Sequence, residues 1–355
     1  MKKFILSTCT FVVPFIILYA INVFNYDQRG AEGDLARMGY FYSNISPKST
    51  INSQYNLPKA YSLLSETKFK SKVEFDVITI GDSFSEQDSL GYKNFLGNLG
   101  PSVLHIDRFI SGSNPIQTLV SLINSGLFEN IKPEFIVLQS IQRDFNDRTK
   151  NVDFNENIDL ELLAKKVKAH KRQSPNYNLQ FFSDATLKMP LNNFQYLFTD
   201  KPVFSNTHKV KTNRQNLFSN SPDHLLFYKN DLRKLSTKND SLKTLNSVII
   251  LNELSDLLSK KNIELIVLVS PDKYDLYYPY IEDKSKFIQP TFYSTYENAE
   301  KEYKNIDTYR ILSDKINEER DIYYYDDSHW APKGTKVIAD EILDMMKKTH
   351  RIDNF

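Results

Sequence analysis

Short apolar, β-branched runs alternate with helix-like stretches along most of this chain, and this alternation constrains the fold more than any other feature. The runs lie at 73–80, 102–106, 134–138 and 263–269. Helix-like patterns lie at 116–128, 242–259 and 333–348. Strands that alternate with helices build a doubly wound parallel sheet with helices on both faces. The sequence therefore predicts an α/β fold, to which residues 321–325 would add a fifth strand.

The N-terminus has the pattern of a membrane-spanning segment. Lys2 and Lys3 precede a stretch from Phe4 to Tyr26 that holds no charged residue, long enough to cross a bilayer as a helix. The stretch exceeds the apolar region of an ordinary signal peptide, which is the alternative, and no clear small-residue cleavage site follows it. We expect residues 1–27 to be an uncleaved, single-pass anchor in the inner or plasma membrane. The two lysines would stay in the cytoplasm, which places the rest of the chain outside it, in the periplasm or at the cell surface.

The remainder of the chain divides into regions of different composition. Residues 28–72 carry scattered Gly, Ser, Asn and Pro and are expected to be a tether and lead-in. Residues 73–350 would form the catalytic domain, and within them 150–240 interrupt the strand–helix rhythm. We interpret 150–240 as an insertion or lid. Its aromatic and basic residues suit either a solvated surface or a substrate-binding subdomain.

Composition and spacing argue against several functions. Lys and Arg number 45 against 44 Asp and Glu, so the chain lacks the basic excess typical of nucleic-acid binders. The only cysteine, Cys9, lies in the apolar segment, which excludes thiol catalysis in the rest of the chain. The six histidines show no paired ligand spacing, and no phosphate loop or dinucleotide fingerprint appears. We expect no metal and no cofactor.

Two short motifs at opposite ends of the α/β region carry the groups needed for acyl transfer. Gly81-Asp82-Ser83 follows the first strand, and Asp326-Asp327-Ser328-His329-Trp330 lies near the C-terminus. A serine becomes a nucleophile when an imidazole takes its proton and a carboxylate holds that imidazole. Alone, each motif would also suit a helix cap or a surface loop. Together they predict Ser83 as nucleophile and His329 as base, with Asp326 or Asp327 as the carboxylate.

These motifs resemble those of the SGNH, or GDSL-like, hydrolases. Gly81-Asp82-Ser83 and Asp326-x-x-His329 match that family in content and in order. The Asp-Ser-His-Trp sequence followed by Gly334 also resembles the Asp-Thr-His-Trp signature of the alginate O-acetyltransferase-like branch. That branch would favour Asp327, but it usually carries its His motif before its Ser motif. The order found here agrees better with ordinary SGNH proteins, and on that ground we prefer Asp326. The resemblance implies an SGNH-type fold.

The oxyanion groups of the family are matched less closely. In the family, a glycine after the second strand donates its backbone amide, and Gly112 fits that location. The usual Gly-x-Asn-Asp motif is absent, and the third strand instead runs into Gln139, Gln142 and Arg143. This segment resembles the Glu-x-x-x-Arg pattern of the acetyltransferase branch. We therefore expect Gly112, Arg143, Gln139 and Gln142 to stabilise the oxyanion, with an ion pair to a neighbouring aspartate as the alternative for Arg143.

Three further residues are expected to bind substrate: Asp82, Lys273 and Trp330. Lys273 lies in a Pro-x-Lys turn after the fourth strand, and similar turns occur in the acetyltransferase-like branch. A purely turn-closing role is the alternative for Lys273.

The anchor and the resemblance together imply an O-acetyltransferase that acts on a cell-surface or secreted polysaccharide. By resemblance, its acyl groups would come from a multi-spanning membrane acyltransferase. A carbohydrate acetylesterase is the alternative with the same catalytic groups. A non-catalytic glycan-binding or assembly protein with this fold is the alternative from another class, and the missing Gly-x-Asn-Asp motif is its support.

Overall fold

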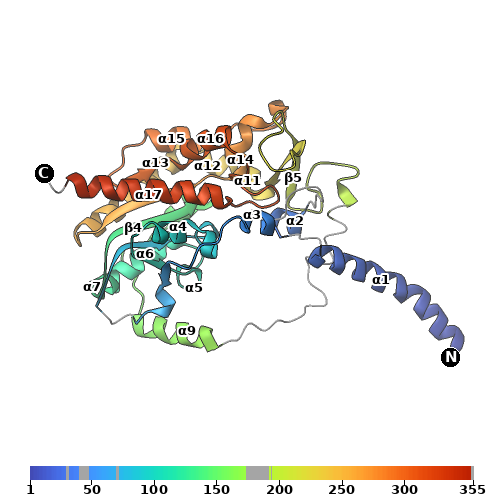
Figure 1. Cartoon of the computed structure of the whole chain (residues 1–355), viewed down its shortest axis with the longest axis horizontal. Coiled ribbons are helices and arrows are strands. Elements are labelled where there is room, and N and C mark those ends of the chain that lie inside the picture. Colours follow the sequence, from blue (N-terminus) through green and yellow to red (C-terminus); the bar gives the residue numbers. More distant parts are fainter. Residues whose placement is uncertain (29–31, 40–47, 69–71, 173–191, 193, 353–355) are drawn as a thin grey trace.

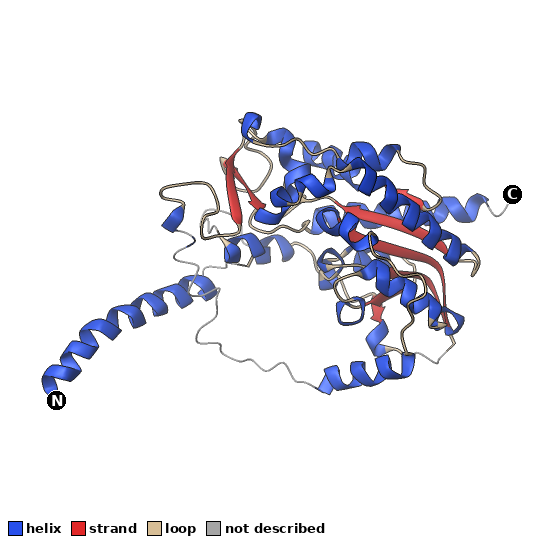
Figure 2. Cartoon of the chain, turned by 180° about the vertical axis from the view of Figure 1, so that it is seen from behind, coloured by secondary structure: helices blue, strands red, loops and turns tan. Residues whose placement is uncertain are grey.

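The computed structural model describes residues 1–28, 32–39, 48–68, 72–172, 192 and 194–352. It confirms the predicted α/β class, with a six-stranded parallel sheet flanked by helices (Figures 1 and 2). The strands, in their order across the sheet, are β1 (Tyr61–Leu63), β3 (Val103–Ile106), β2 (Val73–Ile80), β4 (Ile131–Ile141), β7 (Glu264–Ser270) and β8 (Lys304–Ile306). A separate antiparallel pair consists of β5 (Thr207–Lys211) and β6 (His224–Tyr228).

The helices occupy the segments between the strands and both ends of the chain. In the first half they are α1 (Lys2–Gln28), α2 (Asp34–Met38), α3 (Lys48–Asn52), α4 (Tyr92–Asn98), α5 (Arg108–Ser111), α6 (Pro115–Asn124), α7 (Leu127–Asn130), α8 (Gln142–Thr149) and α9 (Leu160–Arg172). In the second half they are α11 (Lys229–Arg233), α12 (Leu235–Lys238), α13 (Ser241–Ser259), α14 (Lys273–Tyr277), α15 (Phe292–Asn298), α16 (Thr308–Glu318) and α17 (Pro332–Ile352).

Each face of the sheet is covered by its own set of helices, because successive strand residues point to opposite sides. Val137 and Leu268 belong to one apolar cluster, which α4, α16 and α17 cover. Ile136 and Val267 belong to the other, which α6, α7, α13 and α15 cover. Strands buried on both faces are typical of parallel sheets, which explains why these runs are almost continuously apolar.

The order of the strands reverses at β2. From β2 the chain crosses to β3 on one side of it, then returns to β4 on the other side. Open α/β sheets bind ligands outside the carboxyl ends of the strands where the winding reverses in this way. The motif that contains Ser83 follows β2 directly, so the topology brings Ser83 to this edge.

Helix α1 is long and apolar enough, over Lys2–Ala20, to cross a membrane, and none of that window is buried within the protein. This finding is compatible with the expected single-pass anchor. Figure 1 shows α1 extending away from the α/β body.

Two local expectations require correction. The predicted helix at 116–128 is two helices, α6 and α7, separated at Gly126, which adopts φ +75°. Residues 321–325 are not a strand, because Asp321 has φ +59° and only Tyr323 pairs, in an isolated bridge with Trp330. The strand that lies beside β7 at the edge of the sheet is β8.

The segment 150–240 is not uniformly a lid. Its last part contributes β6, whose Leu225, Leu226 and Phe227 are fully buried in the same core as α17. This part of the segment is therefore integral to the fold. Residues 173–191 and 193 lie outside the described residues.

Candidate active site

Ser83 is held at the carboxyl end of β2 by a tight turn. The turn opens a one-turn 3₁₀ helix, Ser83–Ser85, which Asp82 caps by accepting a hydrogen bond from the Phe84 amide at 3.1 Å. Gly81 is required here, because an added Cβ would lie 2.2 Å from the Ser85 hydroxyl and 2.4 Å from the Gln139 side chain. These contacts fix the backbone before and after Ser83.

His329 arrives from the other end of the chain on the loop between α16 and α17. The next residue, Trp330, is fully buried and packs edge-on against Phe84, with ring centroids 5.1 Å apart. Its indole N–H also donates to the Phe84 carbonyl at 3.2 Å. Trp330 therefore ties the histidine loop to the serine turn. The expected substrate-binding role of Trp330 is corrected, because a wholly buried ring in the core cannot contact a sugar.

The structure brings the hydroxyl, the imidazole and one carboxylate into a single chain of hydrogen bonds. Ser83 Oγ lies 2.8 Å from His329 Nε2. On the other side of the ring, His329 Nδ1 lies 2.6 Å from Asp327 Oδ1, and the His329 amide donates to the same oxygen at 2.9 Å. This geometry corresponds to a Ser-His-Asp triad, in which Nδ1 carries the proton and Nε2 is free to accept one.

The carboxylate bonded to His329 is that of Asp327, so the geometry does not support the preference for Asp326. A side chain two residues before His329 can fold back onto both the amide and the ring of that residue, as Asp327 does. Among the described residues, no hydrogen bond joins the Asp326 side chain to His329. The backbone carbonyl of Asp326 instead accepts the amides of Leu35 and Ala36, at 3.0 and 3.1 Å.

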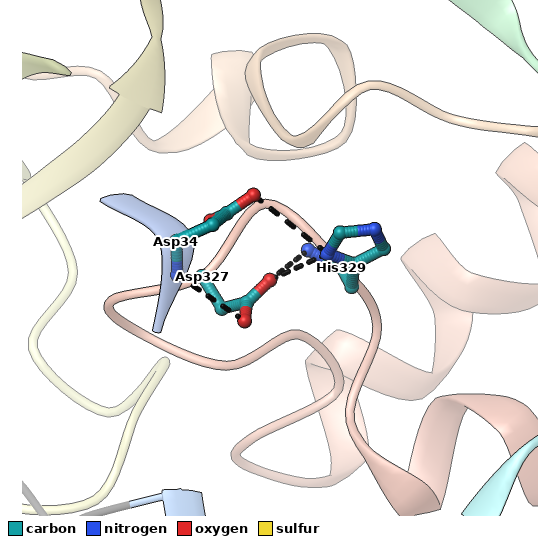
Figure 3. Close-up of side chains that lie close together, drawn as sticks. All are labelled: Asp34, Asp327 and His329. Carbon is teal, nitrogen blue, oxygen red and sulfur yellow. Dashed lines mark hydrogen bonds and ion pairs between the residues drawn. The ribbon is translucent and has the colours of Figure 1, made fainter. Parts of the chain in front are cut away.

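The segment before the α/β domain supplies two groups to this site, a contribution that the sequence pattern did not reveal. Asp34, at the start of α2, accepts both the amide and the hydroxyl of Ser328, at 2.7 and 2.5 Å. Its Oδ2 also lies 3.8 Å from His329 Nδ1, and its amide donates to Asp327 Oδ2 at 3.4 Å (Figure 3). Lys48, at the start of α3, lies 2.8 Å from Asp327 Oδ2. Both residues are hundreds of positions from the loop, so no local signal could have pointed to them.

The charges around His329 favour its protonated form. Burial favours a neutral ring, but Asp327 and then Asp34 outweigh burial and raise the pKa of His329 above its ordinary value of 6.5, while Lys48 opposes them. Burial also favours a neutral Asp327, yet His329 and Lys48 hold the pKa of Asp327 well below its usual range. The pKa of Asp34 is raised by burial and by the nearby Asp327. An anionic Asp327 is the state that stabilises an imidazolium.

The same three residues, Asp34, Asp327 and His329, are close enough to be considered as metal ligands. Their donor atoms are already bonded to protein groups. Asp327 binds the imidazole through one oxygen and Lys48 through the other, and Asp34 binds Ser328 through both. The ammonium of Lys48 would also repel a cation at this position, so the donor set suits a triad better than a metal.

Gln139 and Gln142 do not present donors to an open site. Gln139 is fully buried and crosslinks the ends of three strands, accepting the Asp82 amide at 2.9 Å and donating to Ser270 at 3.0 Å. Gln142 is equally buried and bonds Asp275 and the Asp272 amide. Their expected oxyanion roles are corrected, since both amides are used inside the protein.

Arg143 and Gly112 require the same correction. Arg143 lies 2.9 Å from Asp272 and 3.3 Å from Asp231, both fully buried, so its ion pairs are with carboxylates distant in the chain and not with a neighbouring aspartate. The amide of Gly112 donates to the Arg108 carbonyl at 2.9 Å, where it ends α5 with φ +62°. The Gly112 amide is therefore occupied, and the guanidinium of Arg143 is bound through Nη1 to two buried carboxylates.

Asp82 organises the site through bonds to other protein groups, and it also borders the cavity described below. Its carboxylate accepts the Ile141 amide at 2.7 Å and pairs with Arg148 at 2.5 Å, in addition to capping the serine turn. Although burial favours the neutral acid, Arg148 and these bonds lower the pKa of Asp82. Arg148, which the motifs did not single out, also donates to Ser140 at 2.8 Å. The expected substrate-binding role of Asp82 is therefore corrected to a role in positioning the turn.

A cavity of about 430 Å³ opens beside the serine turn. Its lining includes Asp82, Arg108, Gly112, Ser113, Asn114 and Arg148. Asp82, the residue before Ser83, belongs to this lining, and Ser83 and His329 do not. The cavity therefore adjoins the serine turn through Asp82.

Lys273 is fully buried and reaches toward the catalytic loop. Its ammonium donates to the backbone carbonyls of Tyr324, Tyr325 and Asp327, at 2.7 Å for the first and 3.1 Å for the last. Burial lowers its pKa to about 8, against the opposing charge of Asp326. The expected contact of Lys273 with substrate is corrected, because the side chain holds the loop from inside.

A comparison with models of protein families finds a match in the C-terminal part of the chain. A family model described as "SGNH hydrolase-like domain, acetyltransferase AlgX" matches residues 221–355. This match confirms the resemblance to the alginate O-acetyltransferase-like SGNH branch, and it covers the half of the site that holds Asp327 and His329. No curated protein and no solved structure matches the chain. The match supports an acetyltransferase or esterase role.

Proposed function

We propose that this protein is a membrane-anchored, extracytoplasmic Ser-His-Asp enzyme that transfers acetyl groups to a cell-surface or secreted polysaccharide. The observation that carries the proposal is the chain of hydrogen bonds from Ser83 through His329 to Asp327, at 2.8 and 2.6 Å. The match of residues 221–355 to an acetyltransferase domain supports the choice of acyl group. Helix α1 is compatible with the anchor.

In the proposed reaction, Ser83 carries the acetyl group between donor and acceptor. His329 Nε2 takes the Ser83 proton as Oγ attacks the carbonyl carbon of an acetyl ester. The tetrahedral intermediate collapses, the bond to the donor alcohol breaks, and that alcohol takes the proton from His329. A sugar hydroxyl then gives its proton to His329 and attacks the carbonyl carbon of acetyl-Ser83. When this second intermediate collapses, the bond to Ser83 Oγ breaks, Oγ takes the proton back from His329, and the acetylated sugar is released.

The oxyanion of both intermediates needs donors other than those the family resemblance suggested. The backbone amide of Ser83 has no protein acceptor in the described part of the chain, and it belongs to the residue whose oxygen forms the ester. We propose this amide as one oxyanion donor. The cavity beside Asp82 would receive the acceptor or the donor group.

The proposal also includes an acyl-donor partner in the membrane and a polysaccharide substrate. An anchored enzyme of this kind would receive acetyl groups from a multi-spanning membrane acyltransferase in the same bilayer. The partner and the polysaccharide are inferred from the resemblance to the alginate branch and from α1.

An acetylesterase is the second candidate, because the triad is open to water. The His329 side chain is 18% exposed, and water in place of a sugar hydroxyl would complete the second half of the same reaction. The two candidates differ only in the final acceptor.

Acetyl transfer and hydrolysis can be measured together on the full chain in detergent. We expect the wild type to release nitrophenol from nitrophenyl acetate and Ser83→Ala to lose that activity. Oligosaccharides added as acceptors should gain the mass of acetyl groups if the protein is a transferase, and should remain unmodified if it is an esterase. Equal inactivity of wild type and Ser83→Ala, with and without acceptors, would favour the non-catalytic glycan-binding alternative.

A further inference from the structure

A loop at residues 194–204, here called the apolar loop, turns its large apolar side chains toward solvent. The side chains of Leu197 and Phe198 are 74% and 75% exposed. Phe194, Val203 and Phe204 are 57%, 60% and 67% exposed. Single exposed apolar residues are ordinary, but a contiguous group of them marks a surface that contacts something apolar.

Some polar side chains of the apolar loop are bonded inside it and hold it in shape, whereas Asp200 and Lys201 are exposed. Gln195 is 3% exposed, and its side chain accepts the Phe204 amide at 2.6 Å and donates to the Lys201 carbonyl at 3.1 Å. The Tyr196 hydroxyl lies 2.5 Å from the Ser205 hydroxyl. These internal hydrogen bonds therefore fix the backbone that carries the exposed apolar side chains.

The base of the apolar loop is bonded to the segment that follows α1. The Asn206 amide donates to the Met38 carbonyl at 3.0 Å, and the Thr207 hydroxyl donates to the Leu35 carbonyl at 3.0 Å. Both acceptors belong to α2, which lies at the same end of the molecule as β5 (Figure 1). From Gln28, the last residue of α1, to Asp34, the first of α2, the chain has six residue steps, which span about 21 Å at most.

We propose that the apolar loop inserts into the interfacial layer of the same bilayer that α1 crosses. This inference rests on the anchor in the proposed function. The short connection to α1 keeps the loop near the membrane surface, where the effective concentration of lipid far exceeds that of any diffusing partner. Phenylalanine and leucine side chains insert into this layer, and the exposed Lys201 can reach lipid phosphates from it. Two attachments, α1 and the loop, would fix the orientation of the catalytic domain on the membrane.

Lipid contact can be measured by fluorescence quenching in the full chain, reconstituted in vesicles of phosphatidylcholine and phosphatidylglycerol. An environment-sensitive dye is attached at one cysteine in each sample, and lipids with a nitroxide near the headgroup or in the acyl chain serve as quenchers. The loop is labelled through Phe198→Cys or, as a second position, Val203→Cys, each combined with Cys9→Ser. Ile249→Cys on α13 is the matched control, because Ile249 is as exposed as Val203, at 60%. Native Cys9 in α1 reports on the anchor itself.

We expect nitroxide lipids to quench the dye at positions 9, 198 and 203 and to leave the dye at 249 bright. Quenching at position 9 without quenching at 198 and 203 would overturn the proposal while leaving the anchor intact, and would assign the apolar loop to a protein partner. Absence of quenching at position 9 as well would overturn the anchor and the inference together. Equal quenching at 249 and 198 would also overturn it, because lipid contact would then not be specific to the loop.

Discussion

The ammonium of Lys48 lies 2.8 Å from Asp327 Oδ2, the carboxylate oxygen that does not bind His329. A residue of the segment between the expected anchor and the sheet thus completes the hydrogen bonding of the triad carboxylate. Asp34 of the same segment holds the adjacent Ser328. The catalytic loop is therefore assembled against a part of the chain that composition alone marked only as a tether and lead-in.

Replacing Asp327 by Asn should abolish most activity. The amide cannot hold the imidazole in the tautomer that accepts the Ser83 proton, and we expect kcat to fall by about 10⁴-fold, as in other serine triads. Asp326→Asn is the matched control, because it changes the adjacent carboxyl, which does not bond to His329. The measurement is nitrophenyl acetate hydrolysis by both variants. A large loss in Asp326→Asn with a mild effect in Asp327→Asn would restore the original choice of carboxylate.

Replacing Lys48 by Met should shift the pH dependence of activity upward. The general base must be neutral, so kcat/KM rises with pH through the pKa of His329. Lys48 lowers that pKa, and its removal should move the acid limb of the profile to higher pH. Lys48→Arg should restore the wild-type profile. Lys59→Met, which removes an exposed lysine paired with Glu66, should leave the profile unchanged, and an unshifted profile in Lys48→Met would contradict the assignment.

Replacing Asp34 by Asn should have the opposite effect. Asp34 raises the pKa of His329 through its charge, so the variant should carry its acid limb at lower pH than the wild type. The asparagine oxygen can still accept a bond from Ser328, which limits damage to the loop. The same pH series of kcat/KM tests this. A shift in the same direction as in Lys48→Met would show that the loop has moved and that charge is not the cause.

Replacing Lys273 by Met should weaken both the fold and the activity. Three carbonyls of the catalytic loop would lose their donor, and unsatisfied buried acceptors cost about 1–3 kcal/mol. We expect the free energy of unfolding in urea to fall by about 2 kcal/mol at pH 7, with a loss of activity in the remaining folded protein. A variant as stable and as active as the wild type would show that Lys273 does not hold the loop.

Asp231 should make the stability of the protein depend on pH. Burial, and then the charge of Asp272, raise the pKa of Asp231 from 3.8 to about 8, and its Oδ2 has no hydrogen-bond partner among the described residues. Between pH 4 and 8 the folded protein therefore holds a proton that the unfolded chain has lost, so this group makes stability decline as pH rises through that window. Asp231→Asn should lack this decline.

The check is the free energy of unfolding of both proteins across the same pH range. The stability of Asp231→Asn relative to wild type should increase from pH 4 to 8 and then level off. A constant difference would mean that Asp231 is ionised in the folded protein at neutral pH.

The sequence by itself determined the architecture and pointed to Ser83 and His329, which the structure places 2.8 Å apart. Burial on both faces of a parallel sheet leaves continuous apolar runs, so β2, β3, β4 and β7 were all predicted near their observed positions. Gly81 and the pattern around Ser83 and His329 are likewise local, because a sharp turn after a strand constrains which residues can occupy it. Such features depend on neighbours in the chain and can be read from it.

Only the tertiary structure decided which groups surround those residues. Asp326 and Asp327 are adjacent, and the direction in which each side chain points depends on packing against α2. Gln139, Arg143, Lys273 and Trp330 are polar or amphipathic residues near a predicted site, and they proved to be internal crosslinks whose partners lie far away in the chain. Asp34 and Lys48 reach the site across nearly the whole sequence. Hydrogen bonds and charges act over a few ångströms of space, and sequence separation does not predict that distance.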